Sequence, residues 1–322
     1  MKAIVQEGYG SPDVLRLREI GLPAVADDGV LVRVHAASVN AFDAHLVYAP
    51  PVARPFFGLR SPRIAVRGAD VAGTVESVGR NVTRFKPGDE VFGGAPGAFA
   101  EYASTKEIRL VAKSPRLTFQ EAAALPIAGV TALQGIRDAA RVQPGQRVLV
   151  HGAGGGVGSF AVQIAKALGA HVTAVTSTRK LEMVRSLRPD RILDYSREDF
   201  TRQAERFDVF FDVAGTRPLR DCLRILVPKG TFVAVGSRID SVTAIVGHLL
   251  AVLAASPFTS RRIVLCTARL RSDDLVTLQE MVEAGKIRAA IDREYALPDV
   301  PEAIRYVKAR QGRGKVVIGI KR

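Results

Sequence analysis

The amino-acid sequence predicts an α/β protein of two parts: a mostly β region over residues 1–120, completed by residues 270–322, and a doubly wound parallel sheet over residues 121–269. Three observations predict this class. Short valine-rich runs separated by Gly, Pro, Asp and Asn fill the first part. Strand-like and helical runs alternate in the second part. The length of 322 residues exceeds what one ordinary core accommodates.

The first part contains only short strand-like runs. We predict strands at residues 3–5, 30–36, 73–78 and 90–92. The segment KPGDEVFG, residues 86–93, is a turn that leads into a strand, because Pro-Gly-Asp favours chain reversal. No βαβ repeat is visible, so this region is predicted to be β-rich throughout.

The second part begins with a helix start signal. Thr118 and Glu121 have capping-box spacing ahead of the apolar run AAALPIAGVTAL. The elements that follow alternate, as in a parallel sheet: a strand at 147–152, a helix at 157–168 and a strand at 171–176, then strands at 191–194, 208–213 and 231–235 with helical stretches between them.

The tail of the chain returns to mixed structure. We predict an amphipathic helix at 273–284 closed by Gly285, a second helix at 300–310 and a final strand at 315–320. This tail is expected to fold back onto the first part.

Composition excludes several functional classes. Hydrophobic residues make up 47% and charged residues 24%, as in ordinary globular proteins. Lys and Arg number 46 against 32 Asp and Glu, a net charge of +14. The basic residues are scattered among acidic ones, and no basic block exceeds short pairs such as Arg261-Arg262. This pattern favours a cationic solvated surface over a nucleic-acid partner.

Targeting and redox signals are equally plain. Met1 leads directly into a strand-like run without a signal peptide, and Cys222 and Cys266 lie apart in apolar stretches, as expected of buried thiols in a cytoplasmic protein. The longest apolar stretch, residues 242–258, is short for a membrane span and contains His248. We predict a helix buried in the fold or at a subunit interface, a homodimer, and no integral membrane segment.

A glycine-rich turn is the strongest single signal. Gly152, Gly155 and Gly158 lie between a predicted strand and a predicted helix, within a βαβ unit. The first glycine permits the tight turn, the middle ones let a pyrophosphate approach the backbone, and the last lets helix and strand pack closely. This is the dinucleotide-binding turn of a Rossmann fold, and its predicted cofactor-binding residues are Gly152, Ala153, Gly154, Gly155, Gly156, Val157 and Gly158.

The end of the next strand distinguishes between two cofactors. An NAD-binding protein usually has Asp or Glu there, to accept hydrogen bonds from the ribose. This chain instead has Ser177, Arg179 and Lys180. Hydroxyls and cations bind a 2′-phosphate through charge-assisted hydrogen bonds, so the sequence predicts NADPH.

Segments along the whole chain resemble one family. They are ASVNAFDAHL (37–46), RGADVAGTVESVG (67–79), RFKPGDEVFG (84–93), GAFAEY (97–102), the glycine turn, DRILDYSRED (190–199), FDVFFDVAG (207–215) and GRGKVVI (312–318). The chain is similar to the zinc-free quinone oxidoreductase branch of the medium-chain dehydrogenase/reductases, near the group of the reticulon-4-interacting mitochondrial oxidoreductase.

The resemblance implies a GroES-like catalytic domain, a Rossmann domain and NADPH as the hydride donor. It also implies a set of contacts, with Thr131 near the nicotinamide. The other implied contacts are Ser177, Arg179, Lys180 and Tyr195 at the 2′-phosphate end, and Val213, Gly215, Gly236 and Ser237 at later strand ends. Carboxyl ends of parallel strands are also where elementary fold rules place a ligand.

Zinc ligands typical of related alcohol dehydrogenases are missing. The corresponding segments read VNAFDAH and RGADVAG, without the expected cysteines or the Gly-His-Glu motif, and the five histidines have no ligand spacing. We predict no metal. Without a Lewis acid to activate an alcohol, reduction of a quinone or an α,β-unsaturated carbonyl is the feasible chemistry, and the predicted partner is a small hydrophobic acceptor of that kind.

The resemblance places further candidates after the first β region. Asn40 is expected to hydrogen-bond either the acceptor carbonyl or the nicotinamide ribose, and Tyr48 to donate to a developing oxyanion. With Thr131 they are the predicted catalytic residues. For Asp43 we favour a role in loop structure, and residues 48–62, with Phe56 and Phe57, are expected to form an apolar flap.

Two alternatives remain open at this point. A glycine turn specifies binding and not chemistry, so an NADPH-binding scaffold or sensor with little turnover fits the same motif. An enoyl-thioester reductase also fits, with surface arginines available for the phosphates of such a substrate.

Overall fold

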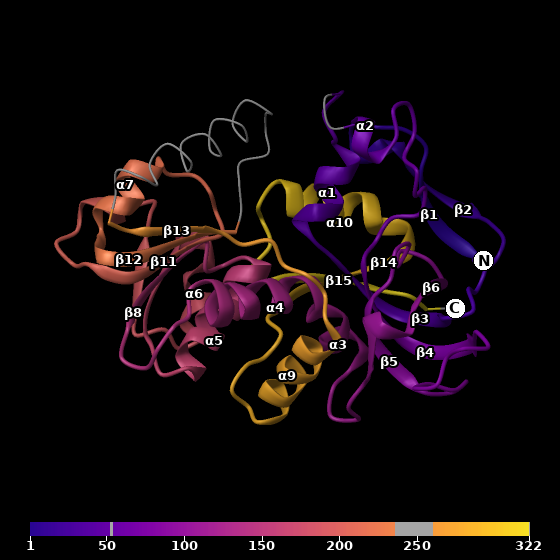
Figure 1. The fold of residues 1–322 in the computed structure, drawn as a ribbon. Helices are drawn as coiled ribbons and strands as arrows, with labels where there is room; N and C mark the ends of the chain where they lie inside the picture. Colours follow the sequence, from indigo (N-terminus) through magenta and orange to yellow (C-terminus); the bar gives the residue numbers. More distant parts are fainter. Residues whose placement is uncertain (52–53, 236–259, 322) are drawn as a thin grey trace. The chain divides into compact units, whose positions relative to one another are not determined.

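The computed structural model describes residues 1–51, 54–235 and 260–321. Contacts group the chain into two compact units (Figure 1). Unit 1 contains Met1–Val130, Leu270–Glu283 and Ile291–Arg322, and unit 2 contains Thr131–Arg269 and Ala284–Ala290. The first division follows Val130, whereas the sequence placed it at 120, because helix α3 (Phe119–Ala124) packs on strands of unit 1.

Unit 1 is built on a seven-stranded sheet with the order β14-β15-β3-β4-β5-β7, in which β6 also pairs with β3. A separate pair, β1 and β2, is antiparallel. The strands are β1 Lys2–Gln6, β2 Leu15–Glu19, β3 Gly29–Val39, β4 Asp70–Val78, β5 Glu90–Gly94, β6 Tyr102–Lys106, β7 Leu110–Ala112, β14 Ile291–Ala296 and β15 Lys315–Gly319. The helices of this unit are α1 Ala41–Val47, α2 Arg54–Phe57, α3, α9 Ser272–Glu283 and α10 Val300–Lys308.

The tail folds back as predicted, because β15 pairs antiparallel with β3, with Val317 opposite Ser38. Apolar side chains of β3, β4, α1 and α10 form one buried core in unit 1. All four strands predicted from valine-rich runs are present, as parts of β1, β3, β4 and β5. Strands β2, β6, β7 and β14 were not predicted, because charged residues interrupt β2 and β14 and the other two are short or polar.

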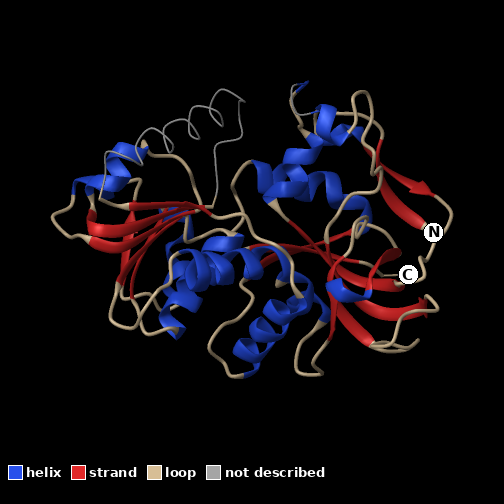
Figure 2. Cartoon of the chain, viewed as in Figure 1, coloured by secondary structure: helices blue, strands red, loops and turns tan. Residues whose placement is uncertain are grey.

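Unit 2 is a six-stranded parallel sheet with the order β10-β9-β8-β11-β12-β13. Figure 2 shows its strands in red, with helices in blue. Its strands are β8 Arg147–His151, β9 His171–Thr176, β10 Arg191–Asp194, β11 Phe207–Asp212, β12 Leu226–Ala234 and β13 Arg262–Leu265. Its helices are α5 Gly156–Ala167, α6 Leu181–Arg185 and α7 Leu219–Arg224, and α4 Pro126–Leu133 begins in unit 1 and ends in unit 2. The predicted doubly wound sheet is therefore present.

Two predictions fall wholly or partly outside the described ranges. The apolar stretch 242–258 lies outside them, as do residues 52–53 and the side chains of Phe56 and Phe57 in the predicted flap. Cys222 is buried as predicted, and burial raises the pKa of its thiol, whereas Cys266 is only partly buried. None of the helices in the described ranges has the length and apolarity needed to cross a membrane.

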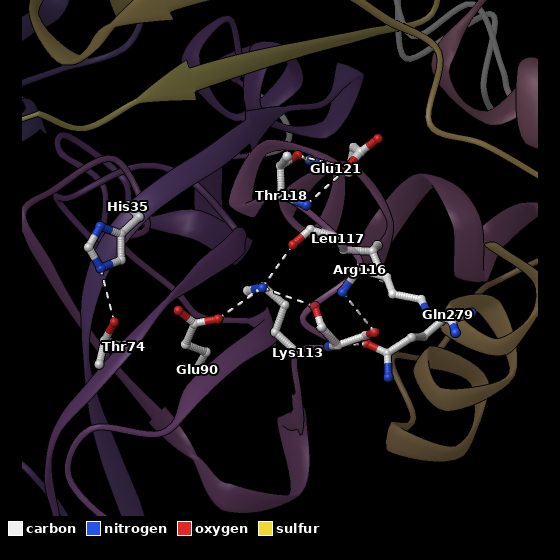
Figure 3. Close-up of polar contacts among 10 residues, drawn as sticks. His35, Thr74, Glu90, Lys113, Arg116, Leu117, Thr118, Glu121 and Gln279 are labelled. Atoms are coloured by element: carbon white, nitrogen blue, oxygen red, sulfur yellow. Dashed lines mark hydrogen bonds and ion pairs between the residues drawn. The ribbon is translucent and has the colours of Figure 1, made fainter. Parts of the chain in front are cut away.

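The entry into α3 shows how a local sequence signal fixes structure. The Thr118 hydroxyl accepts a hydrogen bond from the Glu121 N–H, and the Glu121 carboxylate accepts one from the Thr118 N–H at 2.9 Å (Figure 3). The nearly buried ammonium of Lys113 donates to the Leu117 carbonyl at 2.8 Å and pairs with Glu90 at 2.9 Å (Figure 3). These polar groups are satisfied by one another, so this cluster stabilises the fold.

Candidate functional site

The strand order of unit 2 creates one preferred ligand position. The chain leaves β8 towards β9 on one side, and β11 lies on the other side of β8. At such a reversal the loops that follow neighbouring strands part, and a crevice forms at the carboxyl ends of the strands. The predicted glycine turn follows β8 directly, so it lies at this switch point.

The glycine turn has the geometry that its sequence predicts. Gly152 has a φ of +91°, which side-chain-bearing residues rarely adopt. A Cβ on Gly158 would lie 2.1 Å from the Gly152 carbonyl oxygen, so only glycine permits this close approach of helix to turn. The N–H groups of Gly152 and Ala153 both donate to the Val175 carbonyl at 3.1 Å, which ties the turn to β9.

Gly155 differs from its neighbours because it faces open space. It is the N-cap of α5, with an ordinary φ of −100°, and a Cβ there would meet only the Gly152 oxygen at 3.5 Å. The glycine is therefore not required by the folded chain itself. The first N–H groups of α5 lack acceptors within the helix and favour an anion at this position. The turn thus fits a pyrophosphate.

The Lys180 side chain lies over the glycine turn. A Cβ on Gly154 would come within 2.6 Å of the Lys180 Cδ and 2.7 Å of the Thr176 Oγ1. The lysine stem therefore covers Gly154, and its cation belongs to the same edge of the sheet as the α5 N-terminus. The two sequence predictions, glycine turn and cationic strand end, meet at this point.

The end of β9 carries the other predicted 2′-phosphate contacts. Ser177 is nearly buried as the N-cap of a short 3₁₀ helix, Thr178–Lys180. Arg179 is exposed and has no hydrogen bond or ion pair with any residue in the described ranges, and Tyr195 is exposed at the end of β10. An exposed guanidinium of this kind is available to a ligand phosphate.

Sequence analysis did not predict one acidic residue that lies near the end of β9. Asp194 closes β10, and its carboxylate accepts hydrogen bonds from the Thr178 hydroxyl at 2.5 Å and the Ser196 N–H at 2.9 Å. These hydrogen bonds, that of Thr178 first, lower the pKa of Asp194. The carboxylate organises the loop next to Ser177. Its signal in the sequence is an acid that ends a short apolar strand.

The remaining predicted contacts lie on several elements. Val213 and Gly215 follow β11, and Gly215 has a φ of +59°. Gly236 and Ser237 lie outside the described residues. Thr131 lies in the last turn of α4 and is partly buried. Its predicted place near the nicotinamide stays a prediction.

Asn40 belongs to a buried polar cluster in unit 1 that the sequence did not predict. Its Oδ1 accepts a hydrogen bond from the Lys315 ammonium at 2.7 Å, and its Nδ2 donates to Asp70 Oδ2 at 2.8 Å. A lysine only donates and an ionised carboxylate only accepts, so these partners fix which end of the amide is which. The second N–H points to the Ser38 carbonyl at 3.5 Å. The Asn40 side chain also accepts from the Asp43 N–H in a capping box at the start of α1.

Asp70 is the centre of this cluster. Its Oδ2 also accepts from the Ser38 hydroxyl at 2.7 Å, its Oδ1 accepts from the Ile127 N–H at 3.0 Å, and the Lys315 ammonium lies 3.6 Å from Oδ2. Asp70 and Lys315 are at most 1% exposed. Burial lowers the pKa of Lys315, while Asp70 and Asp43 oppose this change. Sequence reasoning missed Lys315, whose only signal is a cation at the start of an apolar strand.

Asp43 has the structural role that the sequence favoured. Its carboxylate accepts the Asn40 N–H at 2.8 Å at the start of α1. The side chain is buried, and this desolvation raises its pKa to about 7, against the lowering effect of that hydrogen bond. Tyr48 caps the opposite end of α1, with the Lys308 ammonium 5.0 Å from its ring centroid. Asn40 and Tyr48 are therefore not brought together.

Metal ligands do not converge in the part of the chain that the structure describes. No three His, Cys, Asp or Glu side chains there are arranged to hold a metal ion. Asp70 lies in the segment that corresponds to the Gly-His-Glu motif of related enzymes. Its carboxylate accepts three hydrogen bonds, and the Lys315 ammonium lies 3.6 Å from Oδ2. A cation at that distance opposes binding of a second one.

Comparisons with known proteins agree with this geometry. Residues 26–116 match the alcohol dehydrogenase GroES-like domain family, and residues 187–318 match a family described as zinc-binding dehydrogenase. The chain is 33% identical to the NADPH-dependent alkenal/one oxidoreductase of Arabidopsis thaliana, over 99% of this chain and 79% of the relative. It is 31% identical to mouse NAD(P)H oxidoreductase RTN4IP1, over 99% of this chain and 89% of the relative.

Among solved structures, the quinone oxidoreductase from Coxiella burnetii is similar, with a TM-score of 0.89 and 29% sequence identity. The match covers 100% of this chain and 99% of that chain. The similarity therefore extends over both units and is not limited to the glycine turn.

Proposed function

Because this chain belongs to the medium-chain dehydrogenase/reductase superfamily, and its relatives place it with the quinone oxidoreductases, we propose that it transfers hydride from NADPH to a quinone or an α,β-unsaturated carbonyl. The observation that carries the proposal is the cationic edge of unit 2. There the Lys180 side chain covers Gly154 and the Arg179 side chain is exposed. Gly155, the N-cap of α5, has open space at its Cβ position.

The residues of unit 2 divide the binding of NADPH between two anionic groups. The α5 N-terminus and the glycine turn hold the pyrophosphate, because backbone N–H groups and the helix dipole favour negative charge there. Ser177, Arg179 and Lys180 hold the 2′-phosphate through a hydroxyl and two cations. NADPH, when bound, supplies the hydride from its dihydronicotinamide ring.

The orientation of the Asn40 amide favours one of its two predicted roles. Both amide N–H groups point to Asp70 and to the Ser38 carbonyl, so Asn40 has no donor left for an acceptor carbonyl. Contact with the nicotinamide ribose, through a ribose hydroxyl that donates to Oδ1, is therefore the role that we propose for Asn40. Tyr48 carries a phenol, which is a donor of the kind that a developing oxyanion requires.

The proposed reaction includes no metal. The two matched families are named for zinc and for alcohol oxidation, but the Asp70 carboxylate is saturated by hydrogen bonds and has Lys315 beside it. Quinones and enones accept hydride without a Lewis acid, so the protein contributes orientation and binding. Metal analysis of protein purified without added metal is expected to find no stoichiometric zinc.

The decisive experiment is an NADPH oxidation assay over a panel of quinones, enones and enoyl thioesters. Turnover of quinones or enones above the rate without acceptor is expected. Turnover of enoyl thioesters alone would replace the proposed substrate class. Tight NADPH binding with no turnover on the panel would instead support a scaffold or sensor.

Two further properties belong to this proposal. We infer a cytoplasmic location, in which Cys222 and Cys266 stay reduced, although two relatives are named as chloroplastic and mitochondrial. We also infer a homodimer. Cell fractionation tests the first, and light scattering of the purified protein tests the second, where a monomer mass would contradict it.

A further inference from the structure

A buried side-chain pair crosses the switch point of unit 2 directly beneath the proposed cofactor position. His151 is the last residue of β8, and Asp212 is the last residue of β11, opposite it in register. The His151 Nδ1–H donates to Asp212 Oδ1 over 2.9 Å, and both side chains are 2% exposed. The two strands on either side of the switch point are therefore joined at their carboxyl ends.

The pair holds the loop that follows β11, residues 213–218, through several contacts. Asp212 Oδ1 accepts a second hydrogen bond, from the Gly215 N–H at 2.9 Å. The other ring nitrogen of His151, Nε2, lies 3.3 Å from the Thr216 hydroxyl. The Val213 N–H donates to the His151 carbonyl at 3.0 Å. His151 thus contacts this loop through its ring, through its backbone and through Asp212.

The same loop borders the glycine turn. A Cβ built on Gly152 would lie 3.1 Å from the Ala214 N and 3.4 Å from the Val213 Cβ. The β11 loop and the glycine turn are therefore in contact at the point where the strand order reverses. A dinucleotide in a doubly wound sheet extends across this point, with one nucleotide on each half of the sheet.

Stability of the sheet does not require this polar pair. Backbone pairing already joins β8 to β11, and the His151 ring packs against Phe200 and Phe210. Replacing a buried polar pair by apolar residues is often neutral or stabilising. Since the ring is almost inaccessible, His151 does not touch a ligand itself. Its specific contribution is the position of the β11 loop.

We propose that His151, through Asp212 and Thr216, is a positioning residue that holds the β11 loop for the nicotinamide nucleotide of NADPH. This inference rests on the proposed function. The Asp212 carboxylate and the Thr216 hydroxyl transmit the position of the His151 ring to residues 213–216. The adenosine end, at Ser177 to Lys180, is held independently by the β9 end.

The test uses two probes of the full-length protein, NADPH and adenosine 2′,5′-bisphosphate, which contains only the adenosine end. In the double variant His151→Phe with Asp212→Leu, both polar groups are replaced together, so no charge is left buried alone. The dissociation constant for NADPH should rise about tenfold, while that for the bisphosphate stays within twofold. Thr216→Val, which removes only the 3.3 Å contact, should produce a smaller change in the same direction.

Phe210→Leu is the matched control, because Phe210 packs on the rings of His151, Phe200 and Phe232, which all lie outside the loop. It should lower the melting temperature and leave the ratio of the two dissociation constants unchanged. Equal weakening of both probes by the double variant, or weakening of neither, would overturn the inference. Failure of the wild-type protein to bind either probe would instead overturn the proposed function. Should the double variant not fold, the ratio measured for Thr216→Val decides by the same criterion.

Discussion

The glycine turn of unit 2 and the polar cluster of unit 1 carry the two halves of the proposed chemistry, and they are built in different ways. The turn takes its geometry from residues within one contiguous segment, 152–158, and contacts β9 through Val175. The cluster joins Asn40, Asp70 and Lys315, which lie far apart in the sequence and meet because β3, β4 and β15 are neighbours in one sheet. The first is a backbone site and the second a side-chain site.

The difference has a physical consequence for substitutions. The turn faces open space at Gly155, so a change there is expected to act on the ligand and not on the fold. The cluster is buried and charged, so a change there acts on stability first, because a buried charge without its partner costs several kcal/mol. The predictions below use this contrast.

The largest effect on stability is expected for Lys315→Met. Methionine fills a similar volume but leaves Asp70 buried without its cation and removes the ammonium that donates to Asn40 Oδ1. Loss of one partner of a buried pair costs roughly 3–5 kcal/mol, so the melting temperature should fall by on the order of 10 °C. Thermal unfolding followed by circular dichroism measures this. Lys321→Met, at an exposed lysine of the same unit, is the control. A shift of less than about 2 °C for Lys315→Met would show that the cluster adds little.

A smaller, pH-dependent effect is expected for Asp43→Asn. The folded-state pKa of Asp43 is about 7, above its ordinary value of 3.8, so the folded protein binds more protons than the unfolded chain between these values. The contribution of the Asp43 carboxyl to the free energy of unfolding is therefore fully present below about pH 4 and is lost as the pH rises through about 7. Asparagine does not titrate and keeps an acceptor for the Asn40 N–H.

Denaturant unfolding of wild type and variant at pH 5 and pH 8 tests this prediction. From pH 5 to pH 8, the unfolding free energy of Asp43→Asn should rise relative to that of the wild type by on the order of 2 kcal/mol. Asp89→Asn, where a partly exposed carboxylate accepts the Lys86 N–H at 2.9 Å, shows whether loss of one negative charge alone produces the change. A difference that is independent of pH would contradict the raised pKa.

The glycine turn lies in one contiguous segment and the polar cluster does not, so the sequence predicts the first better than the second. The β8 strand, the turn and α5 were predicted with nearly their observed bounds, since strand, glycine spacing and helix lie in one segment. The Thr118 and Glu121 capping box was predicted for the same reason. The bond between Lys315 and Asn40 was not, because only the register of β15 on β3 brings them together.

His151 and Asp212 illustrate an intermediate case. Each ends a buried strand, which is a visible signal, but their hydrogen bond depends on the order of the strands in the sheet. Sequence alone indicates alternating strands and helices and does not state which strands are neighbours. Asp194 was missed similarly, because its contact with Thr178 links two strand ends.

The smallest expected effect concerns cofactor choice. Arg179 is exposed and has no protein partner within the described ranges, so Arg179→Ala should leave stability unchanged. It should weaken NADPH about tenfold, roughly 1.4 kcal/mol, and leave NADH nearly unaffected, because only NADPH carries the 2′-phosphate. Fluorescence titration with both cofactors measures this. The wild-type protein should prefer NADPH at least tenfold, and equal affinities would contradict the assignment of the β9 end.

The most direct test of the account is one titration of NADPH into Gly155→Val, with the melting temperature measured on the same sample. The Gly155 backbone is unstrained for other residues and its Cβ position is open, so the variant should fold with a melting temperature within a few degrees of wild type. Its side chain would occupy the space of the pyrophosphate, and the dissociation constant should rise at least a hundredfold, about 2.7 kcal/mol. Gly21→Val, also at an open position, should leave the affinity unchanged. Wild-type NADPH affinity in folded Gly155→Val would contradict the claim that the glycine turn is the cofactor site.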